Sequence, residues 1–348
     1  MPAWEAKKIC PDLIIVGGDM NKYIYTSSEI MKILREYTPL VQVFSIDEAF
    51  MDVSETKQRF GGEINIAKNI KRRIRERFKI TCSIGIGANK LIAKLAGELK
   101  KPDGLTTLWP QDIPEKIKGL RVSELCGIGR RMEKHLNDMG IKTFLDLHKA
   151  SRTALVKRFG AAYGEQLYHM GQGIDNSEVT PGNVEESAKS MGHSYTMPKF
   201  TTDVEEVKRY LLRLSEQVGR RLRRDNYKGN IVHLSLGFGN FKFWGKQKKL
   251  EDHVDDGYEL YKAAEKLLST SPIKEPCRFV GISVSGLIHK IEQISLFKEK
   301  ERDKKLLATM DAINNRYGDF KIERLAILET VLQKKTGMAA PREYKFTT

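Results

Sequence analysis

The apolar positions in the first half of the chain predict short strands that alternate with helices. Residues 64–78 show the clearest helical period, because Ala67, Ile70 and Ile74 fall on one face. Basic residues fill much of the rest of this helix and predict a solvated face. We expect, in order, a helix that ends before Pro11, a strand over 12–16, a helix over 27–34, strands on either side of 45–48, a strand over 80–87 and a helix over 88–96. This order predicts a mixed sheet with helices on one face.

A polar stretch, residues 174–187, predicts a linker and the best domain boundary, because it holds Pro181 and Gly182 but few large apolar residues. The segments beyond it alternate as strand, helix, strand, strand, helix and strand, over 189–197, 202–224, 230–238, 241–250, 257–268 and 277–287. This order fits a split β-α-β plan. A last helix is expected over 303–317, ended by Gly318.

Two adjacent carboxylates, Asp47 and Glu48, interrupt the apolar run from Val41 to Val53. The β-branched and aromatic residues around them predict two strands that meet in a hairpin without Gly or Pro. Neighbouring side chains on a flat strand point to opposite faces, so a bend is needed to bring both acids together. Oxygen ligands of this kind suit Mg²⁺. The alternative is an ordinary solvated turn.

The composition indicates a partner that carries negative charge. The 348 residues include 60 Lys and Arg against 45 Asp and Glu, a net charge of +15, which favours nucleic acid over a membrane. No apolar run approaches the roughly 18–20 residues of a membrane span, and no secretion signal is visible, so we expect a cytoplasmic protein without a membrane partner. The four cysteines lack metal-ligand spacing and are expected to be reduced core thiols.

Glycines mark two motifs with different meanings. Gly85-Ile86-Gly87 lacks the third glycine of a dinucleotide-binding fold and the Gly-Lys-Ser/Thr of a phosphate loop, which excludes both. In the helical region that begins at Pro110, Gly127-Ile128-Gly129 opens a helix that carries Arg130 and Arg131. This pattern predicts a helix-hairpin-helix, whose amides and helix N-terminus hold a DNA phosphate without reading sequence. A simple helix turn is the alternative. Residues 159–164 resemble a degenerate second copy.

A second candidate DNA surface follows the turn at residues 239–240. Lys242 and Lys246 are interleaved with aromatic residues there, and this mixture predicts a nucleic-acid surface. Phe238 and Phe243 are expected in the core.

The sequence Gln293-Ile294-Ser295-Leu296-Phe297 matches the pentapeptide by which bacterial proteins bind the sliding clamp. In such a peptide Leu296 and Phe297 fill an apolar pocket while Gln293 fixes the register. Burial of Leu296 and Phe297 in a local core is the alternative.

The motif Ser-Ile-Asp-Glu-Ala-Phe-Met-Asp at residues 45–52 resembles the second catalytic motif of the Y-family DNA polymerases, the low-fidelity translesion enzymes related to DinB, UmuC and UvrX. The run from Gly85 to the Lys101-Pro102-Asp103-Gly104 turn resembles their palm helix and the turn after it. The resemblance implies that Asp47 and Glu48 bind two Mg²⁺ ions. It also implies that Lys101 holds the triphosphate of the incoming deoxynucleotide. Asn89 is either a helix cap or a functional group.

The resemblance covers nearly the whole chain and implies a multi-domain α/β right hand, with a palm sheet and helices, a helix-hairpin-helix thumb and a split β-α-β little finger. The implied parts are partial fingers over 1–19, the catalytic palm over 20–108, the thumb over 109–175, a linker over 176–188, the little finger over 189–289, and a tail with the clamp-binding motif over 290–348. The implied partners are a DNA primer–template and the bacterial sliding clamp, bound by a monomer.

The Asp-x-Asp-x-Phe-type motif that carries the family's first metal-binding Asp does not occur before Asp47. We therefore expect a truncated chain that is weakly active or inactive alone. The leading hypothesis is an error-prone translesion DNA polymerase. The second is an accessory of the same fold that binds DNA and the clamp without catalysis. A repair nuclease built on the helix-hairpin-helix ranks last.

Overall fold

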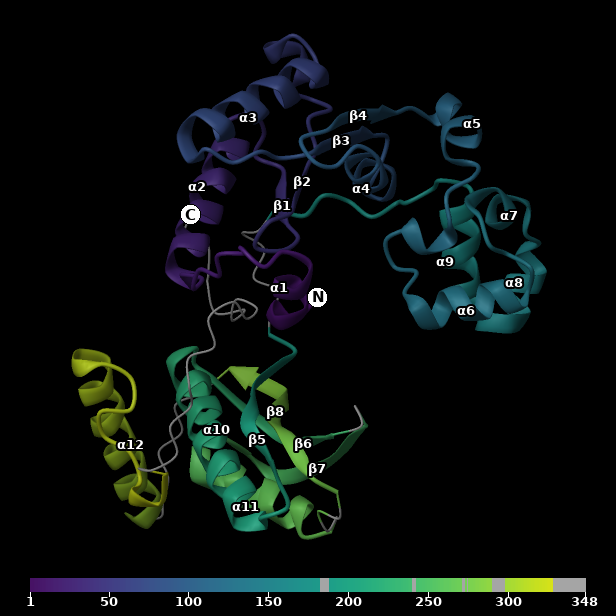
Figure 1. The fold of residues 1–348 in the computed structure, drawn as a ribbon. Coiled ribbons are helices and arrows are strands. Elements are labelled where there is room, and N and C mark those ends of the chain that lie inside the picture. Colours follow the sequence, from purple (N-terminus) through teal and green to yellow (C-terminus); the bar gives the residue numbers. More distant parts are fainter. Residues whose placement is uncertain (182–187, 240–241, 271–272, 274, 290–297, 328–348) are drawn as a thin grey trace. The chain divides into compact units, whose positions relative to one another are not determined.

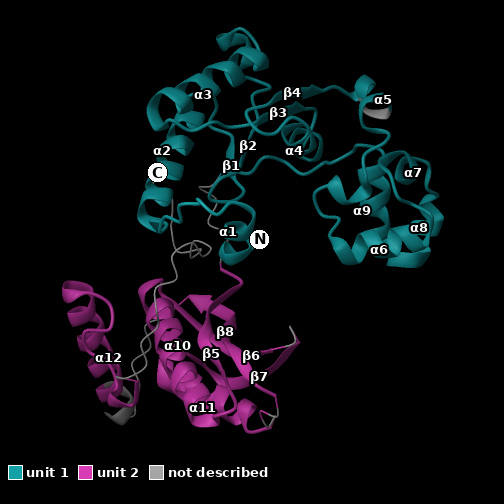
Figure 2. Cartoon of the chain, in the orientation of Figure 1, with its two compact units in different colours: residues 1–185, 335–348 teal, residues 186–334 magenta. Residues whose placement is uncertain are grey.

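The computed structural model describes residues 1–181, 188–239, 242–270, 273, 275–289 and 298–327 (Figure 1). The chain divides into two compact units, residues 1–185 with 335–348 and residues 186–334 (Figure 2). Among the described residues, no helix is both long and apolar enough to cross a membrane.

The first part of unit 1 is a strand hairpin packed on helices. After α1 (Ala3–Ile9) come α2 (Met20–Arg35), β1 (Val41–Val43), β2 (Ala49–Met51), the 3₁₀ helix η1 (Lys57–Phe60) and α3 (Glu63–Phe78). The buried stripe of α3, which includes Ile66, Ile70 and Ile74, packs with Ile33 of α2 and Val41 of β1 in one core. The predicted hairpin and the helix over 64–78 are thus confirmed.

The second part of unit 1 is a parallel strand pair with one helix. β3 (Ile84–Gly87) pairs with β4 (Leu105–Leu108), and α4 (Lys90–Glu98) connects them. A Cβ atom on Gly85 would lie 2.0 Å from the carbonyl oxygen of Ala93 and 2.2 Å from the backbone nitrogen of Gly97. No side chain fits at Gly85, so this glycine permits close approach of strand and helix.

The rest of unit 1 is helical. Its elements are the 3₁₀ helices η2 (Pro110–Asp112) and η3 (Val122–Glu124) and the helices α5 (Ile113–Ile117), α6 (Arg130–Asp138), α7 (Phe144–Lys149), α8 (Arg152–Phe159) and α9 (Ala161–Gly171). Leu136, Phe144 and Leu155 are fully buried in the core of this region. The segment after α9 returns to α4, because the side chain of Asn89 donates to the carbonyl of Gly173.

Unit 2 is a four-stranded antiparallel sheet covered on one face by two helices (Figure 1). The strands β5 (Ser190–Thr201), β6 (Tyr227–Phe238), β7 (Phe243–Val254) and β8 (Cys277–His289) lie in the order β5-β8-β6-β7, and the helices are α10 (Val204–Arg224) and α11 (Gly257–Leu268). The helix α10 connects β5 to β6, and β8 lies between these two strands in the sheet. The helix α11 connects β7 to β8, and β6 lies between them. The predicted split β-α-β plan is therefore confirmed.

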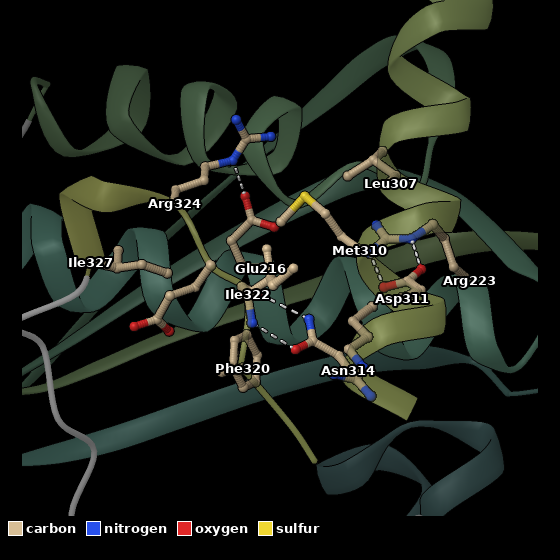
Figure 3. Close-up of a pocket in the computed structure, with 12 residues that line it drawn as sticks. Glu216, Arg223, Leu307, Met310, Asp311, Asn314, Phe320, Ile322, Arg324 and Ile327 are labelled. Carbon is tan, nitrogen blue, oxygen red and sulfur yellow. Dashed lines mark hydrogen bonds and ion pairs between the residues drawn. The ribbon is translucent and has the colours of Figure 1, made fainter. Parts of the chain in front are cut away.

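A C-terminal segment docks on α10 through ion pairs (Figure 3). It consists of α12 (Lys298–Tyr317) and a return to the 3₁₀ helix η4 (Leu325–Ile327). Arg223 holds the Asp311 carboxylate through two hydrogen bonds of 2.6 and 2.9 Å. The guanidinium of Arg324 donates to Glu216 at 2.6 Å. The buried Asn314 side chain accepts from the backbone nitrogens of Lys321 and Ile322 and thereby fixes the return.

Several expectations about unit 1 are wrong. Residues 12–16 do not form a strand, and Ile14 and Val16 are exposed; among the described residues no strand lies beside them to supply hydrogen-bond partners. The strands of unit 1 form two separate two-stranded sheets instead of one mixed sheet. α2 begins at Met20 instead of Ser27, because Asp19 caps it by accepting from two backbone amides.

Some side chains also lie elsewhere than expected. Phe243 is 67% exposed, because it lies at the start of the edge strand β7, whereas Phe238 packs partly against the core. All four cysteines are free, but Cys10 and Cys126 are exposed, so the expectation of core thiols is wrong for these two. α12 begins at Lys298, earlier than the predicted 303.

Candidate active site

Asp47 and Glu48 lie at the tip of the β1–β2 hairpin. The backbone nitrogens of Phe44 and Ser45 both donate to the carbonyl oxygen of Glu48, at 2.9 and 3.1 Å, which closes the tip. The hydroxyl of Ser45 donates to the Asp47 carboxylate at 2.5 Å. Asp47 is exposed and Glu48 is half-buried, so both carboxylates are accessible at one bend of the chain. The structure thus supplies the bend that the acid pair requires.

The helix α2 and the segment after it hold this hairpin at both ends. The buried hydroxyl of Ser27 donates to the carbonyl of Ile46, directly before the acid pair. The buried hydroxyl of Thr38 donates to the carbonyl of Asp52 at 2.6 Å, at the base of the hairpin. These two hydrogen bonds restrict the hairpin, because breaking either one would leave a buried hydroxyl without its acceptor.

Glu48 contacts a cation from α4. The ammonium of Lys94 lies 2.6 Å from the Glu48 carboxylate and 5.3 Å from the centre of the Phe44 ring. Burial opposes the charged form of Lys94, but the hydrogen bond and the attraction of Glu48 outweigh it, so the pKa of Lys94 lies above its ordinary value. Lys94 therefore stays protonated at neutral pH and neutralises part of the charge of the acid pair.

The donor set fits a hard divalent cation in part. Asp47 and Glu48 offer carboxylate oxygens, which Mg²⁺ prefers. In the portion of the chain that the structure describes, no three His, Cys, Asp or Glu side chains cluster as a metal site. The pair would thus provide part of a coordination shell, and water or phosphate oxygens would fill the rest.

Lys101 lies just beyond the C-terminal end of α4. Its ammonium pairs with Glu98 at 2.7 Å, and both side chains are about half exposed. Glu98 is also one of the acids whose attraction raises the pKa of Lys94. Glu48 therefore contacts Lys94 of α4, and Lys101 contacts Glu98 one turn later on the same helix.

Asn89 is a helix cap in this structure. Its side-chain oxygen accepts from the backbone nitrogen of Ile92 at 3.0 Å, at the first turn of α4. The next residue, Lys90, donates to the Gln42 side chain of β1 at 3.0 Å. Asn89 thus fixes the start of α4, and Lys90 connects α4 to the hairpin.

The predicted helix-hairpin-helix has the expected local form. Gly127 has φ +100°, a conformation that favours glycine, and Gly129 is the N-cap of α6. Ile128 is buried, whereas Arg130 and Arg131 are exposed on the first turn of α6. A similar turn at Gly160, with φ +83°, opens α9. Both turns leave helix N-termini that suit a phosphate.

The candidate DNA residues of unit 2 lie on and beside the edge strand β7. Lys242 and Lys246 are exposed, and the ammonium of Lys246 donates to the Thr270 hydroxyl at 3.2 Å. The predicted clamp-binding residues Gln293, Leu296 and Phe297 lie outside the described residues.

Sequence reasoning missed three side chains around the site: Ser27, Lys94 and Lys71, the last of which contacts the turn after Lys101. A signal existed for Lys94, because its spacing of four from Lys90 places both lysines on one face of α4.

Comparisons with known proteins assign this fold. The impB/mucB/samB family model matches residues 1–98, its C-terminal domain model matches residues 188–296, and the DNA polymerase-iota thumb domain model matches residues 123–175. A DNA polymerase IV of Moorella thermoacetica is 40% identical over 330 residues, which cover 94% of this chain and 82% of that protein. A DNA polymerase IV of Pelotomaculum thermopropionicum is 39% identical over 343 residues, which cover 97% and 85%.

Solved structures agree with the sequence matches. A Y-family DNA polymerase chimera of Dbh and Dpo4 superposes with a TM-score of 0.72 at 27% identity, covering 83% of each chain. An insertion ternary complex of Dbh DNA polymerase superposes with a TM-score of 0.53 at 26% identity, also covering 83% of each chain. The fold is that of a right-hand DNA-directed DNA polymerase with a helix-hairpin-helix thumb. The chain belongs to the Y family of DNA polymerases.

Proposed function

We propose that this protein is an error-prone translesion DNA polymerase, which extends a primer opposite damaged template bases by Mg²⁺-dependent transfer of deoxynucleotides with release of pyrophosphate. The observation that carries the proposal is the hairpin tip, where Ser27 of α2 binds the carbonyl directly before the acid pair and Glu48 pairs with Lys94 of α4, the helix that ends near Lys101.

The acid pair would hold the metal. Asp47 and Glu48 are the metal ligands in this proposal, and two Mg²⁺ ions when bound would activate the primer hydroxyl and stabilise the leaving pyrophosphate. Lys94 limits the negative charge at the tip. Lys101 would exchange its half-exposed contact with Glu98 for the triphosphate, for which a compact ammonium is suited.

The remaining parts would hold DNA and partners. In this proposal residues 20–108 act as the palm, 109–175 as the thumb and 189–289 as the little finger. The amides of residues 127–129 with Arg130 and Arg131, and Lys242 with Lys246, contact the phosphate backbone, which accords with a net charge of +15. Gln293, Leu296 and Phe297 bind the sliding clamp.

The direct test is primer extension past an abasic site with Mg²⁺ and deoxynucleotides. We expect Asp47→Ala to lower the rate by at least about a hundredfold, because it removes a carboxylate that would hold the metal ions that stabilise the charged transition state. The matched control is Glu55→Ala, an exposed acid shortly after the same hairpin, which should extend like the wild type. Unchanged extension by Asp47→Ala would overturn the catalytic assignment.

A second candidate is a non-catalytic accessory that binds primer–template and clamp. One observation favours it: among the described residues, no third acid or His joins the pair as a metal site. Titration with primer–template and with clamp, with and without Mg²⁺ and nucleotide, separates the two candidates. Tight binding of both partners without nucleotide incorporation would favour the accessory.

A further inference from the structure

Lys71 on α3 is bound to the turn that follows Lys101. Its ammonium donates to the carbonyl oxygens of Cys82 at 2.6 Å, Asp103 at 2.9 Å and Gly104 at 3.3 Å, and also to the Asp103 carboxylate. An ammonium has three hydrogens, so these acceptors use all of its donor capacity. Although Lys71 belongs to a basic helix face, its ammonium hydrogens are bound to acceptors within the protein, so it is not placed to bind phosphate itself.

The turn that receives Lys71 is tightly closed. Asp103 adopts φ +56°, which is uncommon for a residue other than glycine. A Cβ on Gly104 would lie 2.3 Å from the carbonyl oxygen of Lys100, so the backbone folds back directly around Lys101. The backbone nitrogen of Gly104 donates to the Ser83 hydroxyl at 3.1 Å, and its carbonyl accepts from Ile84.

The charge of Asp103 strengthens this attachment. The hydrogen bond from Lys71 is the largest cause that lowers the pKa of the Asp103 carboxyl, and the attraction of Lys71 and Arg75 adds to it. Arg75, one turn further along α3, lies 3.4 Å from the other carboxylate oxygen of Asp103. Two cations of α3, Lys71 and Arg75, therefore bind Asp103 in the turn, and Lys71 is the more buried of the two.

We propose that Lys71 is a positioning residue that sets the affinity for the incoming triphosphate, by fixing the backbone from which Lys101 reaches it. The inference rests on the proposed function, since it assumes that Lys101 meets the triphosphate. Lys101 itself is half exposed, and within the described ranges its ammonium pairs with Glu98 alone, so its placement depends on the turn. Lys71 connects that turn to α3, whose buried stripe lies in the same core as the catalytic hairpin.

The first experiment measures amide hydrogen exchange of residues 99–106 in the chain alone. Lys71→Met keeps the length of the side chain but removes its donors, and it should speed exchange in this segment by about tenfold. The matched control is Lys68→Met, which changes an exposed lysine one turn earlier on the same helix. Unchanged exchange in Lys71→Met would overturn the inference.

The second experiment measures deoxynucleotide affinity of the complex with a dideoxy-terminated primer–template, in the presence of Mg²⁺. We expect Lys71→Met to weaken deoxynucleotide binding about tenfold with primer–template affinity unchanged, and Lys68→Met to stay within about twofold. In a Lys101→Met background, Lys71→Met should add no further loss, because Lys71 acts through Lys101.

The outcomes separate this inference from the proposed function. Normal deoxynucleotide affinity in Lys71→Met, or an equal loss in the Lys101→Met background, overturns the positioning role alone. A wild-type complex that binds no deoxynucleotide overturns the proposed function and the inference together. A wild-type complex that binds deoxynucleotide but never extends a primer overturns only the proposed catalysis.

Discussion

The ammonium of Lys94 forms an ion pair with Glu48 and so places a positive charge beside the acid pair. The two side chains are 37% and 20% exposed, so the contact is only partly screened by water. A divalent cation that approaches Glu48 must compete with the Lys94 ammonium for the same carboxylate. Because the pKa of Lys94 is raised, this competition persists across neutral pH and weakens only as the pH rises above the ordinary lysine range.

Lys94→Met should therefore tighten binding of a divalent cation to the DNA-free protein, by roughly threefold to tenfold for the loss of one partly screened charge. Titration with Mn²⁺ followed by electron paramagnetic resonance measures this affinity. Lys68→Met is the control, because it removes an exposed lysine of α3 and leaves the contacts between α4 and the hairpin in place. Weaker or unchanged Mn²⁺ binding in Lys94→Met would show that Lys94 does not compete with the metal.

At the scale of elements, the C-terminal segment is held to α10 by charge. Asp311 is 20% exposed and its partner Arg223 is 12% exposed, and Arg223 also donates to the carbonyl of Asp255. Breaking such a pair from one side leaves a largely buried guanidinium without its counter-charge. The neighbouring pair between Arg220 and Asp319 differs, because Asp319 is 77% exposed and water can replace it.

Asp311→Ala should lower the free energy of opening of the segment 298–327 by about 2 kcal/mol, roughly thirtyfold in the opening equilibrium. Asp319→Ala should change it by less than about 1 kcal/mol. Amide exchange of α12 measures both, since it reports local opening without requiring the two units to unfold together. Equal effects of the two substitutions would mean that burial of Asp311 adds nothing to the docking.

The elements that the sequence predicts well are those whose pattern is local. The helix over 257–268 matches α11 at both ends, because Asp256 caps it and its apolar period is unbroken. The acid hairpin follows from β-branched residues around one pair of carboxylates. The strand over 12–16 fails because an apolar run says nothing about a neighbouring strand. The contact between Lys94 and Glu48 is not predicted, because the two residues are 46 positions apart in the sequence and only the packing of α4 on the hairpin brings them together.

At the scale of the whole molecule, the net charge of +15 is shared by both units, and each contributes candidate phosphate contacts. Arg131 belongs to the helix-hairpin-helix of unit 1, and Lys242 precedes the edge strand β7 of unit 2. If both contact one duplex, each releases counterions from the same DNA. Their contributions to the salt dependence of binding then add.

Arg131→Gln and Lys242→Gln should each make the slope of log affinity against log salt less negative by about 1, and the double variant by about 2, equally for different DNA sequences. Fluorescence anisotropy of a primer–template over a range of salt concentrations measures these slopes. Lys68→Met removes one positive charge from the exposed face of α3 and should leave the slope unchanged. A double variant whose slope matches either single variant would mean that the two units do not hold the same duplex, because independent phosphate contacts on one DNA must add.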